Sequence, residues 1–136
     1  MKLRELSRKA TVRRLDDWFS RYTRWRQADN KGFAKCCTCN KVDHVTKLQC
    51  GHFMSRKKRA TRWLEINCSV QCFSCNMRQQ GNQYAFSKYI DKKHGEGMAE
   101  AIHLLSLKKV KHTTADLMKL TEYYKKETKK LTRIYG

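Results

Sequence analysis

The spacing of apolar side chains predicts a chain built mainly of amphipathic helices around a central segment that is not helical. Near the N-terminus, large apolar residues recur at helical spacing, with arginines on the other sides; they are Leu15, Trp18, Phe19, Tyr22 and Trp25. Such a stripe is typical of a helix that buries one face in the core. The turn-forming stretch ADNKG, residues 28–32, ends this helix.

Three further helices are expected in the second half of the chain. The pattern YAFSKYI favours a helix from Cys75 to about Lys92, closed by HGEG, and MAEAIHLLSLKK favours the next one. Thr113 or Thr114 can cap the last helix. Its apolar stripe contains Leu117, Leu120, Tyr124 and Leu131.

The central residues 33–72 contain most of the cysteines, several β-favouring stretches and few helical repeats, which predicts a zinc knuckle followed by a short hairpin. We expect an α+β fold, mostly helical, in three parts: a basic N-terminal helical arm (1–32), a core (33–94) and a C-terminal helical region (95–136). No apolar run approaches the roughly 20 residues that span a bilayer, so no membrane is expected. The stretch MKLRELSRKATVRR lacks the apolar region of a signal peptide, which favours a cytoplasmic location.

The net charge of the chain limits the class of molecule that it is expected to bind. The sequence has 31 Lys and Arg residues against 12 Asp and Glu residues, a formal net charge of +19. A field of this strength favours contact with a polyanion and makes such binding depend on salt. The lysines of the last helix are interpreted as a solvated face rather than as a specific reader of DNA.

Four of the seven cysteines predict a structural zinc site. They form two CxxC pairs, Cys36 with Cys39 and Cys72 with Cys75, and 32 residues (40–71) separate the pairs. A CxxC turn places two thiolates on one side of a tight bend, so two such turns complete a tetrahedral site. A reducing environment also argues against a disulfide framework.

Three cysteines are left over, namely Cys37, Cys50 and Cys68. Cys37 could replace Cys36 only with poorer geometry. Cys50 is the more serious rival, because Cys50 and His52 in the stretch LQCGHFMSR offer a ligand pair of their own. Since four cysteines already saturate zinc, we favour the two CxxC pairs.

His52 then has three interpretations: a zinc ligand, a packed core histidine, or a general base. A phosphodiester hydrolase needs a base to deprotonate water and a hard cation to neutralise charge on the leaving oxygen. A neutral imidazole can act as that base near pH 7. Asn76 directly follows the last CxxC pair, and an amide oxygen can hold a hydrated Mg²⁺.

The order of these motifs resembles a known family. CCTCNK, LQCGHFMSR, ATRWLEINCSVQCFSCN and the following GN together look like the HNH, or ββα-metal, nucleases, and more closely the phage NinG/Rap recombination proteins. The resemblance implies a ββα-metal core with a zinc knuckle, flanked by the N- and C-terminal helices. It also implies a structure-specific endonuclease that acts on Holliday junctions and D-loops, encoded by a phage and working in the bacterial host cell.

Site residues follow from the resemblance. His52 matches the general base, Asn76 a ligand of the catalytic metal, and Asn67 the middle asparagine, which holds the His-bearing loop in shape. Arg56 and Arg62 lie on the insert between the two CxxC pairs and can clamp phosphate, because a guanidinium suits bidentate contact. Of the two, Arg62 lies in the better-matching segment.

One departure concerns the second ligand of the catalytic metal. The related phage endonuclease VII places an acid directly before its base histidine, where this chain has Gly51. Gln49 stands where some NinG relatives carry an acid. Glu65, Asn82 and a backbone carbonyl are the candidates that remain; Glu65 is alternatively the ion partner of Arg62.

We therefore expect a zinc-stabilised endonuclease that uses Mg²⁺ or Mn²⁺ on branched DNA. The rival is a non-catalytic zinc protein that binds DNA and assists recombination. Because two symmetric nicks need two sites, a homodimer is expected. Its interface would use the apolar stripes of the first and last helices.

Overall fold

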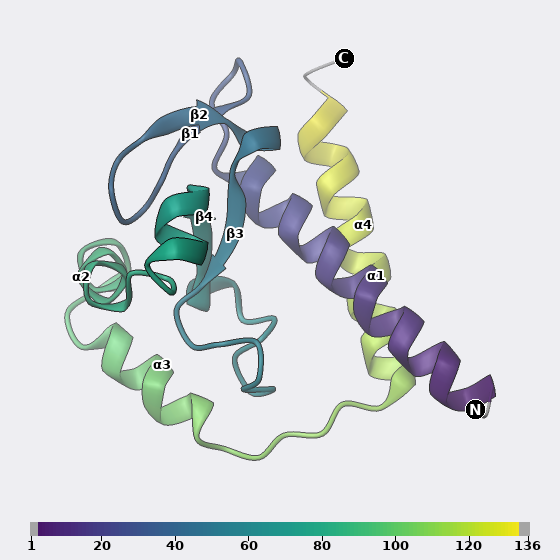
Figure 1. The fold of residues 1–136 in the computed structure, drawn as a ribbon. Helices are drawn as coiled ribbons and strands as arrows, with labels where there is room; N and C mark the ends of the chain where they lie inside the picture. The colour runs from purple at the N-terminus through teal and green to yellow at the C-terminus, as the bar shows by residue number, and fades with distance from the viewer. Residues whose placement is uncertain (1–2, 134–136) are drawn as a thin grey trace.

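The computed structural model describes residues 3–133, and the side chains of residues 8–133. In chain order the elements are α1 (Leu3–Arg26), β1 (Phe33–Lys35), β2 (Val42–His44), η1 (Val45–Lys47), β3 (Gln49–His52), η2 (Glu65–Asn67), β4 (Cys68–Gln71), η3 (Ser74–Arg78), α2 (Gln83–His94), α3 (Met98–Ser106) and α4 (Thr114–Thr132). Figure 1 shows β3 and β4 with α1 and α4 on one side and α2 and α3 on the other. The expected α+β class is confirmed.

The strands form two antiparallel hairpins. In the first, β1 pairs with β2 from Phe33 opposite His44. In the second, β3 pairs with β4, with Gln49 opposite Gln71 and His52 opposite Cys68. Because alternate residues of a strand face opposite sides, Cys50 and His52 share one face of β3 while Gln49 and Gly51 share the other. The central segment was expected to hold a zinc knuckle followed by a short hairpin; the first CxxC pair lies in a hairpin of its own, β1 and β2, and the second hairpin, β3 and β4, follows it.

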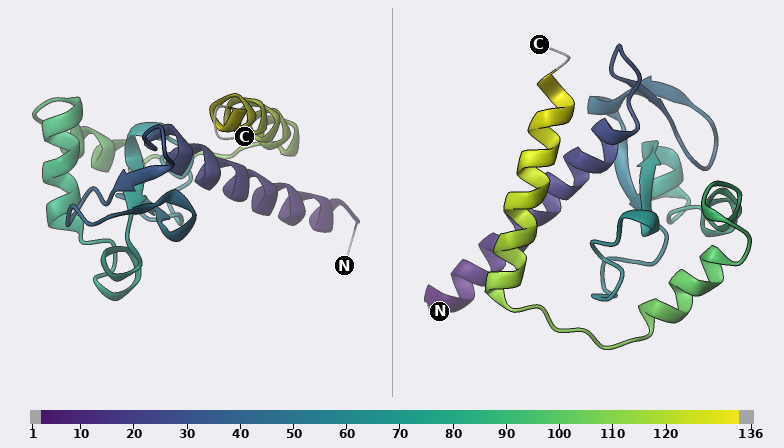
Figure 2. Two further views of the ribbon diagram at one scale, coloured as in Figure 1. Left: turned by 90° about the horizontal axis from the view of Figure 1, so that it is seen from above. Right: turned by 180° about the vertical axis from the view of Figure 1, so that it is seen from behind.

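Helices α1 and α4 come from the two ends of the chain and cross each other (Figure 2). Leu15 and Phe19 of α1 are buried against Leu117 and Tyr124 of α4. The rings of Phe19 and Tyr124 meet edge to face, 4.9 Å apart. Full burial of side chains of this size stabilises a fold by about 1.5–3 kcal/mol each. The centres of both apolar stripes thus pack against each other within one chain.

The helix expected from Cys75 to about Lys92 is interrupted. A π-helical turn, η3, ends at Arg78, and α2 begins only at Gln83. Between them Gln80, Gly81 and Asn82 all have positive φ, which no continuous right-handed helix allows. The break turns the chain after the second CxxC pair, so that η3 and α2 are separate elements.

The remaining helices follow the sequence pattern closely. Thr113 caps α4 through a capping box, in which its hydroxyl accepts from the backbone N–H of Asp116 and the Asp116 carboxylate accepts from the backbone N–H of Thr113. α2 and α3 bury Phe86, Ile90 and Ile102 together in a separate apolar cluster. In the described part of the chain, no helix has the length and apolar character needed to cross a membrane.

Candidate functional site

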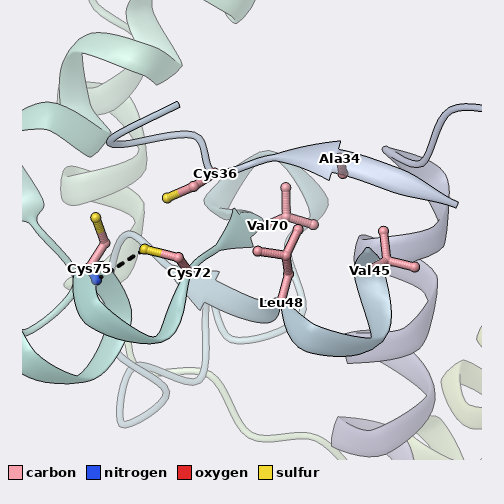
Figure 3. Packing of buried hydrophobic residues seen from close by; sticks show 7 residues of the cluster. All are labelled: Ala34, Cys36, Val45, Leu48, Val70, Cys72 and Cys75. Atoms are coloured by element: carbon pink, nitrogen blue, oxygen red, sulfur yellow. Dashed lines mark hydrogen bonds between the residues drawn. The ribbon is translucent and has the colours of Figure 1, made fainter. Parts of the chain in front are cut away.

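The two CxxC pairs meet at one place in the fold. Cys36 and Cys39 lie in the turn between β1 and β2, and Cys72 and Cys75 follow β4. Their four Sγ atoms all lie within 4.8 Å of one another, and those of Cys39 and Cys72 are 3.7 Å apart. Figure 3 shows three of these side chains beside the apolar cluster of Val45, Leu48 and Val70.

Polar groups around the sulfur atoms test whether these residues fit a metal. The backbone N–H of Cys75 donates to Cys72 Sγ over 3.5 Å, the dashed line in Figure 3. The Asn82 amide donates to Cys75 Sγ over 3.8 Å, and the Thr38 hydroxyl lies 3.4 Å from Cys36 Sγ. N–H donors of this kind orient and stabilise metal-bound thiolates. The four cysteines therefore fit a zinc ion, as predicted.

His52 is the last residue of β3, and its ring lies near α1. Its Nε2 lies 3.0 Å from the carbonyl oxygen of Arg62. A carbonyl can only accept, so Nε2 carries the proton in the neutral ring and Nδ1 keeps its lone pair. Burial lowers the pKa of His52 to about 4, against the opposing effect of that hydrogen bond. The imidazole is therefore neutral near pH 7, as a general base requires.

Asn67 is fully buried and holds the segment between β3 and η2 in shape. Its Oδ1 accepts from the backbone N–H of Met54 over 2.8 Å. Its Nδ2 donates to the carbonyl oxygens of Met54 and Thr61 at 3.1 Å and 3.0 Å. These bonds close the loop that follows His52, the part that the resemblance implies for the middle asparagine.

Asn76 lies in η3 and reaches back to β3. Its Nδ2 donates to Gln49 Oε1 over 2.7 Å. In the sequence, Gln49 is notable only because it stands where some relatives carry an acid. The structure makes Gln49 the immediate neighbour of Asn76, so two side-chain amides lie together.

Asp16 of α1 is a residue that the sequence did not point to. Arg62 binds it through two nitrogens, Nε to Oδ1 at 3.2 Å and Nη2 to Oδ2 at 2.5 Å. The indole N–H of Trp63 also donates to Asp16 Oδ1 over 2.9 Å. The side chain of Arg62 is consequently only 14% exposed, whereas that of Arg56, 3.8 Å from Asp16, is 62% exposed. Of the two arginines, Arg56 is the one open to a ligand.

The two candidates for a second metal ligand lie elsewhere. Glu65 binds Arg26 at 3.0 Å and accepts from the hydroxyls of Tyr22 and Tyr124. It is therefore not the partner of Arg62, and it does not face Asn76. Asn82 points its amide toward Cys75 and so supports the cysteine cluster.

A cleft of about 480 Å³ joins most of the predicted site residues. Residues of α1, β3 and η3 line it. His52, Gln49, Asn76, Arg56 and Asp16 all line it. Arg62 and Asn67 lie behind this surface as supports of the His52 loop.

Comparison with known proteins gives one family. The model described as "Bacteriophage Lambda NinG protein" matches residues 2–134. The chain belongs to the NinG family. The match spans all of the described elements of this NinG family chain, including α1 and α4, and not only the cysteine-containing centre. Neither the curated proteins nor the solved structures gave a significant match.

Proposed function

We propose that this NinG family chain is a metal-dependent, structure-specific endodeoxyribonuclease that nicks branched recombination intermediates such as Holliday junctions and D-loops. Its core would be of the ββα-metal type, with β3 and β4 as the two strands and η3 as the helical turn. The observation that supports this best is the shared cleft. A neutral histidine, a pair of amides and an exposed arginine line one surface.

His52 would act as the general base. With Nε2 held by the Arg62 carbonyl, Nδ1 is the atom that takes a proton from water. The water oxygen would attack the scissile phosphorus in line as the bond to the 3′ oxygen breaks, leaving a 5′-phosphate end. Arg56 would contact the phosphate, because its guanidinium is exposed at the cleft.

Asn76 and Gln49 would hold Mg²⁺ or Mn²⁺. Two amide oxygens suit a hard cation that keeps several waters and takes few protein ligands. Nδ2 of Asn76 now meets Gln49 Oε1, so rotation of the Asn76 amide would present a second oxygen at the same place. Bound there, the cation would stabilise negative charge on the leaving oxygen.

Asp16 and Arg62 would position the base. Arg62 supplies the carbonyl that fixes the His52 ring, and Asp16 anchors the Arg62 side chain and Trp63 to α1. Asn67 fixes the other end of the same loop. These residues act through His52 rather than on the substrate.

The decisive experiment compares His52→Ala with a control variant, His103→Ala, which removes an exposed histidine of α3. We expect His52→Ala to lower the cleavage rate of a four-way junction by about 10²-fold or more, with junction affinity nearly unchanged, because a base acts in the transition state. His103→Ala should cleave as the wild type does. Cleavage should stop in EDTA and return with Mg²⁺ or Mn²⁺. Binding without cleavage in the wild type, under every metal condition, would favour the non-catalytic DNA-binding alternative.

A further inference from the structure

Two cysteines outside the four-cysteine site lie beside His52. Cys50 shares the α1-facing side of β3 with His52, and Cys68 is the residue of β4 directly opposite His52. Cys68 is buried, and both cysteines pack in the cluster formed by Leu15 and Phe19 of α1. The register of the hairpin therefore brings three potential metal ligands to one face.

The three groups are close enough to share an ion. One ligand atom each from Cys50, His52 and Cys68 all lie within 4.8 Å of one another. Around a tetrahedral zinc ion, ligand atoms are about 3.3–3.8 Å apart, as bond lengths of about 2.0–2.3 Å require. Small side-chain rotations can close that difference, since the strand pairing already fixes the backbones.

The chemistry of this trio differs from that of the neighbouring amides. Thiolates and imidazole select zinc and softer ions, whereas amide oxygens select Mg²⁺ and Mn²⁺. Three protein ligands also leave a fourth position open, unlike the closed four-cysteine site. His52 is thus shared by two sets of potential ligands: the two thiols, which favour zinc, and the amides of the cleft, which favour Mg²⁺ and Mn²⁺.

We propose that Cys50, His52 and Cys68 form a second, weaker binding site for zinc-class ions, and that its occupancy inhibits the enzyme. Binding releases the two thiol protons to solvent and leaves a neutral imidazole as the third ligand. Once His52 donates its lone pair to a metal ion, it cannot accept a proton from water. The inhibitory part rests on the proposed function, whereas the binding part does not.

The binding part is tested by metal content. Protein holding its first zinc is dialysed against excess Zn²⁺ with a non-thiol reductant, and bound zinc is counted by elemental analysis. We expect two zinc ions per chain in the wild type and one in Cys50→Ser and in Cys68→Ser. The matched control is Cys37→Ser, which removes a surplus cysteine outside the trio and should keep two.

One zinc per chain in the wild type would overturn the second site, as would an equal loss in Cys37→Ser. The zinc that remains in each variant reports that the four-cysteine site, and hence the fold, is intact. A variant that loses both ions is replaced by the other cysteine variant, so the comparison still decides.

The inhibitory part is tested by cleavage in Mg²⁺ with rising Zn²⁺, each variant being compared with its own rate at one zinc per chain. Wild type and Cys37→Ser should lose about 10-fold or more of that rate as the second zinc binds, and Cys50→Ser should lose much less. Equal inhibition in Cys50→Ser would overturn the inhibitory role. If two zinc ions bind but no condition gives cleavage, the proposed nuclease fails while the metal site stands.

Discussion

His52 is neutral because it is buried, and burial has a consequence for stability that is separate from any activity. Its folded pKa of about 4 lies below the ordinary value of 6.5. Between these two pH values the unfolded chain binds a proton that the folded chain does not. The free energy of unfolding therefore falls as pH falls through this window.

We predict that His52→Gln weakens this pH dependence. From pH 7 to pH 5.5 the wild type should lose about 1 kcal/mol more unfolding free energy than His52→Gln, because glutamine does not titrate. Urea unfolding at the two pH values measures the difference. His103→Gln, at an exposed position, should respond to pH as the wild type does; an equal loss in all three proteins would contradict a buried neutral His52.

The packing around Gly51 explains why this chain carries no acidic residue directly before His52. The side chain of Gln71 crosses over Gly51, and a Cβ at that position would overlap Gln71 Oε1. Gln71 itself is fully buried and donates to Thr38 Oγ1 and to the carbonyl oxygen of Gly81. The space that an acidic side chain would need is therefore filled by a glutamine from the opposite strand.

We predict that Gly51→Ala destabilises the protein by about 1–3 kcal/mol, the usual cost of overpacking a filled interior. In a Gln71→Ala background the same change should cost much less, because the overlapping atoms are gone. A double-mutant cycle by chemical unfolding measures this coupling. Additive effects of the two changes would show that the two side chains do not compete for space.

At the residue scale, the sequence motifs predicted most of the residues of the proposed site, but not all of them. His52, Asn67 and Asn76 were found because each follows a recognisable stretch. Asp16 was missed, since it is one more charged residue on an amphipathic helix and only the fold brings it to Arg62. Gln49 carried a weak positional signal, whereas its contact with Asn76 depends on how η3 folds back on β3.

At the scale of elements, the four-cysteine site lies where the two hairpins meet, beside the small apolar cluster of Ala34, Val45, Leu48 and Val70 that they share. It links the turn of the first hairpin to the end of the second, and both hairpins are short. Hairpins of this length are only marginally stable in water. A bound metal ion would therefore reinforce the small apolar cluster that these short strands build.

We predict that Cys72→Ser loses the zinc ion and most of the fold, because metal binding in such a site is coupled to folding. The expected loss is several kcal/mol, or about 10 °C or more in Tm. Zinc content and thermal unfolding measure it, with Cys37→Ser as the control that keeps both. A Cys72→Ser protein with unchanged Tm would mean that the strands need no metal.

Periodicity located the helices well and their interruptions poorly. The apolar stripes of α1 and α4 and the cap at Thr113 follow from patterns of three and four residues. The break between η3 and α2 depends on left-handed conformations at Gln80 and Asn82, which do not alter an apolar repeat. The stretch QQGN carried the signal, in its glycine and asparagine.

At the scale of the whole molecule, the described chain offers one cleft of the proposed kind, and four-way junctions need two symmetric nicks. We predict that two copies act together as a homodimer, at least on a junction, because a two-fold axis matches that substrate. Since Leu15, Phe19, Leu117 and Tyr124 are buried within the chain, we expect the contact to use other residues. Light scattering at micromolar protein, with and without junction DNA, measures the state; a monomer in both would contradict the prediction.

The crossing of α1 and α4 also sets an order of events during folding. The Arg8 guanidinium of α1 reaches the Thr114 hydroxyl, a contact between residues 106 positions apart. At synthesis rates of about 5–20 residues per second, the start of α4 is made roughly 5–20 seconds after α1. The cysteine knuckle closes over a much shorter stretch, so we expect it to form first. The apolar face of α1 can pack on Trp63 and Cys68 early, but its cover is complete only when Leu117 and Tyr124 of α4 have been made.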